Sequence, residues 1–270
     1  MTHSLVSYSH IAPKVPVSYQ IWMQLVTSLD DRSEMAEIEK IVSRDPGLVV
    51  KIMAVANSVY FGQGEGVNTL EESLMRLGSM EVVRLAAMLA FQDTTAEGLP
   101  LYGLTQKDFT SHSVYTAMLM AGLAKQANLT PGEAYTLGLV RGLGHWFIQQ
   151  ALRSQNISVR PYEGPLIEAN TWEEDVLQIN HAEFAANTLR QFRMPSPLLN
   201  TLSFYLRPHR ATNVAGATLL LSCTEQAVRD VLPARRLQNA SLPQDWYLAY
   251  AAETEFQDLC AKGHRLLSSL

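Results

Sequence analysis

DPGLVVKIMAVANSVYFG, residues 45–62, carries the pattern that decides the fold. Asp45 stands where a helix cap is expected, and Pro46 follows at the first helical position, where its missing N–H costs nothing. Apolar residues then recur at the spacing of one helix face, at Leu48, Ile52, Val55 and Ala56. The stretch closes on a glycine-rich segment. It therefore predicts an amphipathic helix with a defined start and a defined end.

The same start signal returns along the chain. An N-cap residue with an acid three positions later precedes apolar residues at four places: Thr69 with Glu72, Thr130 with Glu133, Thr171 with Glu174, and Asn180 with Glu183. No alternating run of β-branched residues occurs, and the Asn-Gly and Asp-Gly pairs of tight hairpins are missing from the sequence. The sequence therefore predicts an all-α protein of about a dozen helices, with irregular stretches at residues 91–105 and 154–170.

Composition and charge argue against several classes of function. The 270 residues include 21 lysines and arginines against 26 acidic residues, and the net charge of -5 gives no general attraction to nucleic acid or anionic membranes. SMEVVRLAAML, residues 79–89, follows a glycine turn as a DNA-reading helix would. The acidic chain and the lack of a basic recognition helix count against that interpretation. We expect neither a nucleic-acid partner nor a membrane partner.

The signals for cellular location point to the cytoplasm. Cys223 and Cys260 are far apart and match no Cys-x-x-Cys spacing, so neither a disulfide framework nor a zinc cluster is predicted. The longest uncharged stretch, residues 109–124, falls short of the roughly 20 apolar residues that span a bilayer. The first residues lack the basic start and apolar block of a secretion signal. We therefore expect a cytoplasmic protein.

Five segments together resemble a known family, the HDOD domains. They are IVSRDPGLVVKIMAVANSVYFG (41–62), ESLMRLGSMEVVRLAAML (72–89), SHSVYTAMLMAGLA (111–124), AYTLGLVRGLGHWFI (134–148) and INHAEFAANTLRQFRMP (179–195). HDOD domains are bacterial all-α regulatory domains related to the HD and HD-GYP metal-dependent phosphohydrolases. The most specific part of the resemblance is the series Asp45, Pro46, Lys51, Ala56, Asn57, Ser58, Tyr60 and Gly62.

The resemblance implies a multi-helix, HD-like bundle with two subdomains. The HDOD domain would occupy residues 13–210, with an N-terminal helical subdomain at 13–92 and a degenerate HD-like subdomain at 105–210. Residues 211–270 would add C-terminal helices that complete the bundle or offer a dimer face.

The metal site of the catalytic relatives is incomplete in this sequence. In those relatives a first histidine, a His-Asp pair on the next helix and further ligands hold divalent metals, which activate water and polarise a phosphate ester. By resemblance His112 falls at the first histidine, but Arg141 and Gly142 stand where the pair is expected, within GLVRGLGHWFI (138–148). Glycine has no ligand atom, and a guanidinium donates hydrogen bonds without coordinating cations. We therefore expect no metal, no cofactor and no catalytic residue.

Four histidines remain as weak metal candidates: His112, His145, His181 and His209. His145 lies four residues after Arg141, and a shift of one helical turn, about 5 Å, is too large to leave a coordination sphere intact. Simpler interpretations are favoured for the others. His112 fits a hydrogen-bonded core residue, His181 a first-turn residue packed beside Glu183, and His209 a solvated loop.

Two further places are candidates for recognition. A buried guanidinium at Arg141 needs an acceptor. The favoured interpretation is an internal Glu or Asp in the space that the metal left. The alternative is a bound anion such as a nucleotide phosphate or a carboxylate. The second place is the helix end at Asn57, Ser58, Tyr60 and the glycines that follow. A capped terminus that anchors the N-terminal subdomain is the favoured interpretation there.

Two functions from different classes follow from these observations. The first is a non-catalytic signal-transduction protein that binds a partner protein or a small regulatory ligand. The second is an HD-type phosphohydrolase with an altered metal-ligand set drawn from the four histidines. The missing His-Asp pair favours the first.

Overall fold

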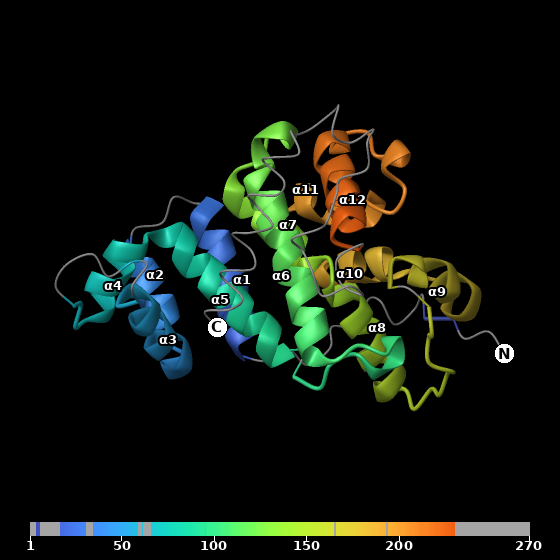
Figure 1. The fold of residues 1–270 in the computed structure, drawn as a ribbon, viewed down its shortest axis with the longest axis horizontal. Helices are drawn as coiled ribbons and strands as arrows, with labels where there is room; N and C mark the ends of the chain where they lie inside the picture. The colour runs from blue at the N-terminus through green and yellow to red at the C-terminus, as the bar shows by residue number, and fades with distance from the viewer. Residues whose placement is uncertain are drawn as a thin grey trace. The chain divides into compact units, whose positions relative to one another are not determined.

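The computed structural model describes residues 4–5, 17–30, 35–58, 61, 66–94, 96–164, 166–192 and 194–229. Within these ranges the chain forms α-helices and short 3-10 helices without any β-strand, which confirms the all-α prediction (Figure 1). Tyr60 and Gly62 of the family motif lie outside the described residues, as does the segment 230–270. None of the described helices is long and apolar enough to cross a membrane.

The chain divides into two compact units, one spanning Lys14–Thr94 and the other combining Met1–Pro13 with Thr95–Leu270. The first, called here the α1–α5 unit, contains α1 (Val17–Asp30), α2 (Met35–Val42), α3 (Pro46–Ala56), α4 (Leu70–Leu77) and α5 (Ser79–Thr94). The second, the α6–α12 unit, contains α6 (Gln106–Gly122), α7 (Pro131–Val140), α8 (Leu143–Ser154), α9 (Ala169–Leu177), α10 (His181–Arg190), α11 (Ser196–Phe204) and α12 (Ala215–Arg229).

The predicted start of α3 is confirmed. One carboxylate oxygen of Asp45 accepts the backbone N–H groups of Gly47 and Leu48 at 2.9 and 3.1 Å, and Pro46 occupies the first turn. At the other end of the helix, the side chain of Asn57 donates to the carbonyl of Val67 at 2.9 Å and accepts its N–H at 2.8 Å. The end of α3 is thereby tied to the segment that leads into α4.

Helix starts elsewhere follow the sequence in all but one case. Thr69 and Thr130 form reciprocal capping boxes with Glu72 and Glu133, and the side chain of Asn180 accepts the N–H of Glu183. The predicted start at Thr171 is wrong.

The 3-10 turn Leu166–Glu168 runs directly into α9, so this helix begins at Ala169 and Thr171 lies inside it. The carboxylate of Glu174 accepts hydrogen bonds from the side chains of Asn180 and Arg207 and takes no part in a cap.

Two glycines bring the helices of the α6–α12 unit into close contact. A Cβ atom added at Gly138 of α7 would lie 2.5 Å from the Cα of Ala117 in α6. One added at Gly144 of α8 would lie 2.0 Å from the carbonyl oxygen of His181 in α10. No side chain fits at either crossing. These contacts fix the depth at which residues 141 and 145 enter the interior.

Candidate functional site

A cluster of polar side chains occupies the interior of the α6–α12 unit, and it is called here the buried polar cluster. Its members come from six helices and two adjoining turns, and each is at most 5% exposed: Tyr102, His112, Arg141, His145, Glu173, His181, Tyr205 and Glu225. Buried polar groups of this density are stable only when they satisfy one another. These side chains therefore depend on contacts with one another.

Arg141 pairs with two side chains of the chain itself. Its Nη1 lies 2.6 Å from Oε2 of Glu225 and forms an ion pair with it, although the N–H bond does not point at the oxygen. Its Nη2 contacts Nδ1 of His112. Because a guanidinium only donates, Nδ1 of His112 accepts and the ring proton sits on Nε2, 3.6 Å from Oε1 of Glu225. Burial and the charge of Arg141 together hold the pKa of His112 well below its usual value. His112 is thus a neutral acceptor.

Glu225 is the acid that balances this charge. Burial raises its pKa above the usual value for a glutamate, and the adjacent Arg141 opposes that rise. The carboxylate comes from α12, whereas Arg141 caps the C-terminal end of α7 and His112 lies on α6. Three helices therefore meet at one buried ion pair.

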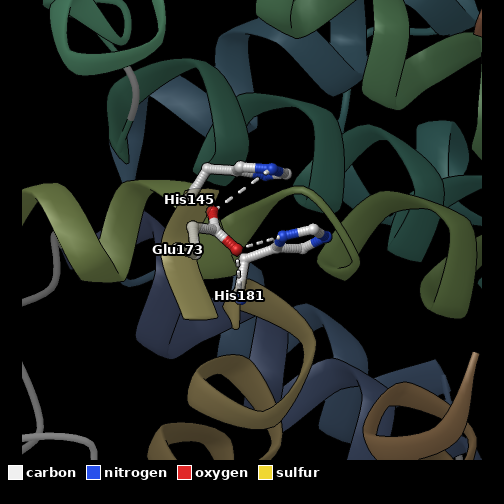
Figure 2. Close-up of side chains that lie close together, drawn as sticks. All are labelled: His145, Glu173 and His181. Atoms are coloured by element: carbon white, nitrogen blue, oxygen red, sulfur yellow. Dashed lines mark hydrogen bonds and ion pairs between the residues drawn. The ribbon is translucent and has the colours of Figure 1, made fainter. Parts of the chain in front are cut away.

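Glu173 organises the other half of the cluster. One of its oxygens accepts the hydroxyl of Tyr102 at 2.7 Å, and the other accepts both the backbone N–H and the ring Nδ1–H of His181 at 2.7 Å. The Nε2 of His181 pairs with the hydroxyl of Tyr205. Figure 2 shows the carboxylate of Glu173 with one oxygen directed toward His181 and the other toward His145. Both ring nitrogens of His181 are thus engaged.

His145 contributes two buried ring nitrogens without a hydrogen-bond partner to the cluster. Its ring stacks on that of His181 with centroids 3.8 Å apart and an interplanar angle of 21°, and the ring of Tyr102 meets it edge to face at 4.8 Å. Its Nε2 is 3.9 Å from Oε1 of Glu173, and neither ring nitrogen makes a hydrogen bond. Burial, followed by electrostatic interactions with His181 and Arg141, places the pKa of His145 well below its usual value.

His145 follows Arg141 by four residues across a junction between two helices. Helix α7 ends at Val140 and α8 begins at Leu143, while the linking residues Arg141 and Gly142 keep right-handed helical backbone angles. Beyond that junction, the close approach at Gly144 carries His145 onto the ring of His181. The contact of His145 with His181 is therefore set by the close packing of α8 on α10.

The position of the expected His-Asp pair does not fit a metal. Arg141 fills it with a charge that repels cations, and Gly142 has no space for a carboxylate beside it. A Cβ atom at Gly142 would lie 2.7 Å from Oγ of Ser113 and 3.2 Å from the ring of Phe109. The chain at this point packs directly against α6.

A second group of side chains does converge. Ligand atoms of His145, Glu173 and His181 all lie within 4.8 Å of one another, and two histidines with one glutamate form a donor set that zinc accepts. The rings of the two histidines are nearly parallel, however, while a bound metal lies in the plane of each imidazole that holds it. Glu173 and His181 are also already hydrogen-bonded to each other. The trio as it stands is a hydrogen-bonded pair, Glu173 and His181, with the ring of His145 stacked on that of His181.

The remaining candidates lie apart from this cluster. His209 is exposed in the 3-10 turn Pro208–Arg210. In the α1–α5 unit, Lys51 is exposed, while Asp45 and Asn57 serve the two ends of α3. The hydroxyl of Ser58 donates to the carbonyl of Val55 at 2.7 Å. The described motif residues thus have local roles at a helix start and a helix end.

Sequence reasoning missed four members of the buried polar cluster: Tyr102, Glu173, Tyr205 and Glu225. A signal for Glu225 exists in the sequence, since Leu221 and Val228 lie four residues before and three after it on the apolar face of α12, and both are fully buried. An acid on such a face is a buried acid that needs a partner. No comparable local signal marks the other three.

Acid should weaken the α6–α12 unit through its neutral histidines. Below about pH 6.5 a histidine in the unfolded chain is protonated, whereas His112 and His145 stay neutral in the folded state because their pKa values are lowered. The unfolded state therefore binds more protons, and the free energy of unfolding falls as pH falls. Replacing His145 with leucine should reduce this slope by about 0.7 kcal/mol per pH unit at about pH 6.5, where the unfolded histidine is half protonated, rising toward about 1.4 near pH 5. Denaturant unfolding at several pH values measures it.

The matched control for this pH series is the exposed His209. His209→Leu should leave the slope of the unfolding free energy against pH unchanged. Because Glu225 is present in all three proteins, its opposite contribution cancels in the comparison. Equal slopes for His145→Leu and the parent protein would contradict a neutral, buried His145.

Comparison with known proteins adds three kinds of match. A family model for the HDOD domain matches residues 12–208. An uncharacterized protein of Treponema pallidum (strain Nichols) is 22% identical over 179 residues, which cover 64% of this chain but only 33% of that protein. The chain thus spans about a third of that relative's length.

Two solved structures resemble the chain over nearly its whole length. A proposed phosphohydrolase from Shewanella amazonensis SB2B matches with a TM-score of 0.68 at 18% identity, and the match covers 96% of this chain and 94% of that protein's chain. A proposed signal-transduction protein from Marinobacter aquaeolei VT8 has a TM-score of 0.69 at 20% identity, covering 98% of this chain and 59% of its own. At these identities the likeness shows a shared fold.

Proposed function

Since the chain belongs to the HDOD domain family, we propose that it is a regulatory signal-transduction protein without phosphohydrolase activity. It acts by binding a partner protein or a small regulatory ligand, and it needs no metal for that role. A cytoplasmic location without nucleic-acid or membrane partners is part of the same proposal, and the net charge of -5 supports it.

One observation carries the proposal. The guanidinium of Arg141, at the position where the family resemblance leads us to expect a His-Asp pair, is fully buried and ion-paired with Glu225. HD-type hydrolysis depends on a metal that activates water and binds the phosphate ester. A guanidinium supplies no ligand for such a metal, and its charge raises the free energy of any cation beside it.

A second candidate function rests on the trio of His145, Glu173 and His181. If these residues bound a divalent metal, it would supply Lewis-acid chemistry to a phosphohydrolase with an altered ligand set. His145, with two unpartnered ring nitrogens, would be free to bind, whereas His181 would have to exchange a hydrogen bond for a metal bond. The stacked rings and the nearby Arg141 favour the regulatory proposal over this one.

Metal retention combined with hydrolysis assays separates the two functions. Protein purified without a chelator or a histidine tag is incubated with manganese, iron, nickel and zinc, desalted, and analysed by inductively coupled plasma mass spectrometry. We expect well below one equivalent of every metal. We also expect no hydrolysis of phosphodiesters or phosphomonoesters above the rate of a His181→Ala control.

The outcome that would overturn the proposal is equally defined. Near-stoichiometric retention of one metal, lost in His145→Ala or His181→Ala and accompanied by hydrolysis, would establish the phosphohydrolase. The exposed His209→Ala variant is the control that should retain whatever the parent protein retains.

A further inference from the structure

Arg141 joins three helices that are distant in the sequence. From the end of α7 its guanidinium reaches His112 on α6 and Glu225 on α12. The hydroxyl of Tyr205, at the end of α11, lies close enough to interact with it as well. Arg141 is fully buried, and none of these three partners is more than 5% exposed. Water therefore contributes little to the solvation of this charge.

Glu225 depends on Arg141 for its charge balance. The carboxylate sits on the apolar face with which α12 packs into the unit, beside the fully buried Leu221 and Val228. Its ion-pair contacts are Arg141 at 2.6 Å and His112 at 3.6 Å. Because His112 is neutral, Arg141 is the cation in ion-pair contact with it among the described residues, and its charge lowers the pKa of Glu225 more than that of His181 does. Without Arg141 a buried charge would stand alone on the packing face of α12.

We propose that the guanidinium of Arg141 is a built-in cation that does the structural work of a metal ion, holding α12 against α6 and α7. It neutralises the carboxylate of α12 and binds the imidazole of α6, which are the two kinds of group that a divalent metal would bind at this place. The proposal rests on the proposed function in one respect, the absence of a metal. It goes beyond that function because it assigns the docking of α12 to a cation that is covalently part of the chain.

The chemistry of arginine suits this role. A guanidinium stays charged at every physiological pH, and its planar set of donors serves two acceptors on different helices at once. Gly142 completes the arrangement, because the absence of a side chain lets residues 141–142 pack directly against Ser113 and Phe109 of α6. The cation therefore reaches the interior without a cavity for an ion.

A double-mutant cycle on the full chain tests the coupling. Arg141→Met and Glu225→Gln each leave one buried charge or acceptor without its partner, and each should lower the Tm by on the order of 10 °C. The loss of Tm in the double variant should be much smaller than the sum of the two single losses, because the double variant leaves no unpaired charge. Strictly additive losses would overturn the proposal.

Matched controls separate a specific effect from general damage. Arg153 pairs with Glu97 at the surface, where the two side chains are 46% and 72% exposed, so Arg153→Met should move the Tm by no more than about 3 °C. A chelator should leave the Tm of the parent protein unchanged. A Tm that falls with chelator would show that a metal, and not Arg141, holds the unit together, and would also overturn the proposal.

Hydrogen exchange gives a local measurement if Arg141→Met fails to fold. In Glu225→Gln and in the conservative Arg141→Lys, backbone amides of α12 should exchange faster, while those of α1–α5 keep their parent rates. Unchanged exchange in α12 would contradict the proposed docking role. These readouts concern stability alone, so their failure leaves the regulatory function standing, whereas hydrolytic activity would refute that function without touching the coupling.

Discussion

Replacing Gly144 with alanine should prevent the α6–α12 unit from folding stably. The added Cβ would lie 2.0 Å from the carbonyl oxygen and 2.7 Å from the carbonyl carbon of His181, and backbone atoms at a helix start cannot move aside as a flexible side chain does. We expect a loss above about 4 kcal/mol, at the extreme end for a single substitution. Soluble yield and denaturant unfolding monitored by circular dichroism measure it.

The matched control is another helical glycine of the same unit. At Gly216, near the start of α12, the closest atom to an added Cβ is 3.6 Å away, which is ordinary contact. Gly216→Ala should leave stability unchanged or slightly higher, because alanine is the better helix former. If Gly144→Ala were as stable as Gly216→Ala, α8 would not approach α10 as described.

Replacing Glu173 with alanine should produce the second-largest loss of stability. The substitution leaves the hydroxyl of Tyr102 and two N–H groups of His181 without their acceptor in a fully buried place. An unsatisfied buried donor costs about 1 to 3 kcal/mol, so we expect a total of roughly 3 to 5 kcal/mol after relaxation. Equilibrium unfolding in urea measures it.

The neighbouring acid provides the control for Glu173. Glu174 pairs with Arg207 where the two side chains are 33% and 38% exposed, and it accepts one hydrogen bond from Asn180. Glu174→Ala should therefore cost about 1 to 2 kcal/mol, less than Glu173→Ala. The two variants remove the same chemical group from adjacent positions. Equal losses would show that Glu173 does not organise the cluster.

The helices were predictable because their signals are local. Asp45, Thr69 and Thr130 each cap a helix through atoms two or three residues away, and such contacts can be read directly from spacing. Thr171 carries the same signal, but the preceding 3-10 turn places the cap at Glu168, three residues earlier (171 − 168). Local patterns thus predict that a helix exists better than they predict where it begins.

The candidate site was predictable only in part, because it is assembled from distant segments. The family resemblance directed attention to His112 and Arg141, whose neighbours in the sequence carry the motif. Glu225 meets them through helix packing, 84 residues after Arg141 (225 − 141), and Glu173 meets Tyr102 across 71 residues (173 − 102). Spacing along one helix could not place His145 either, since the close contact at Gly144 lies between two different helices.

The tight packing at Gly142 leaves no room for the aspartate of a His-Asp pair. A single change that returned an aspartate to position 142 would drive its side chain into Ser113 and Phe109. A histidine returned to position 141 would strand the carboxylate of Glu225. A His-Asp pair could therefore be built into this interior only by altering several buried positions together, and each single change would cost stability.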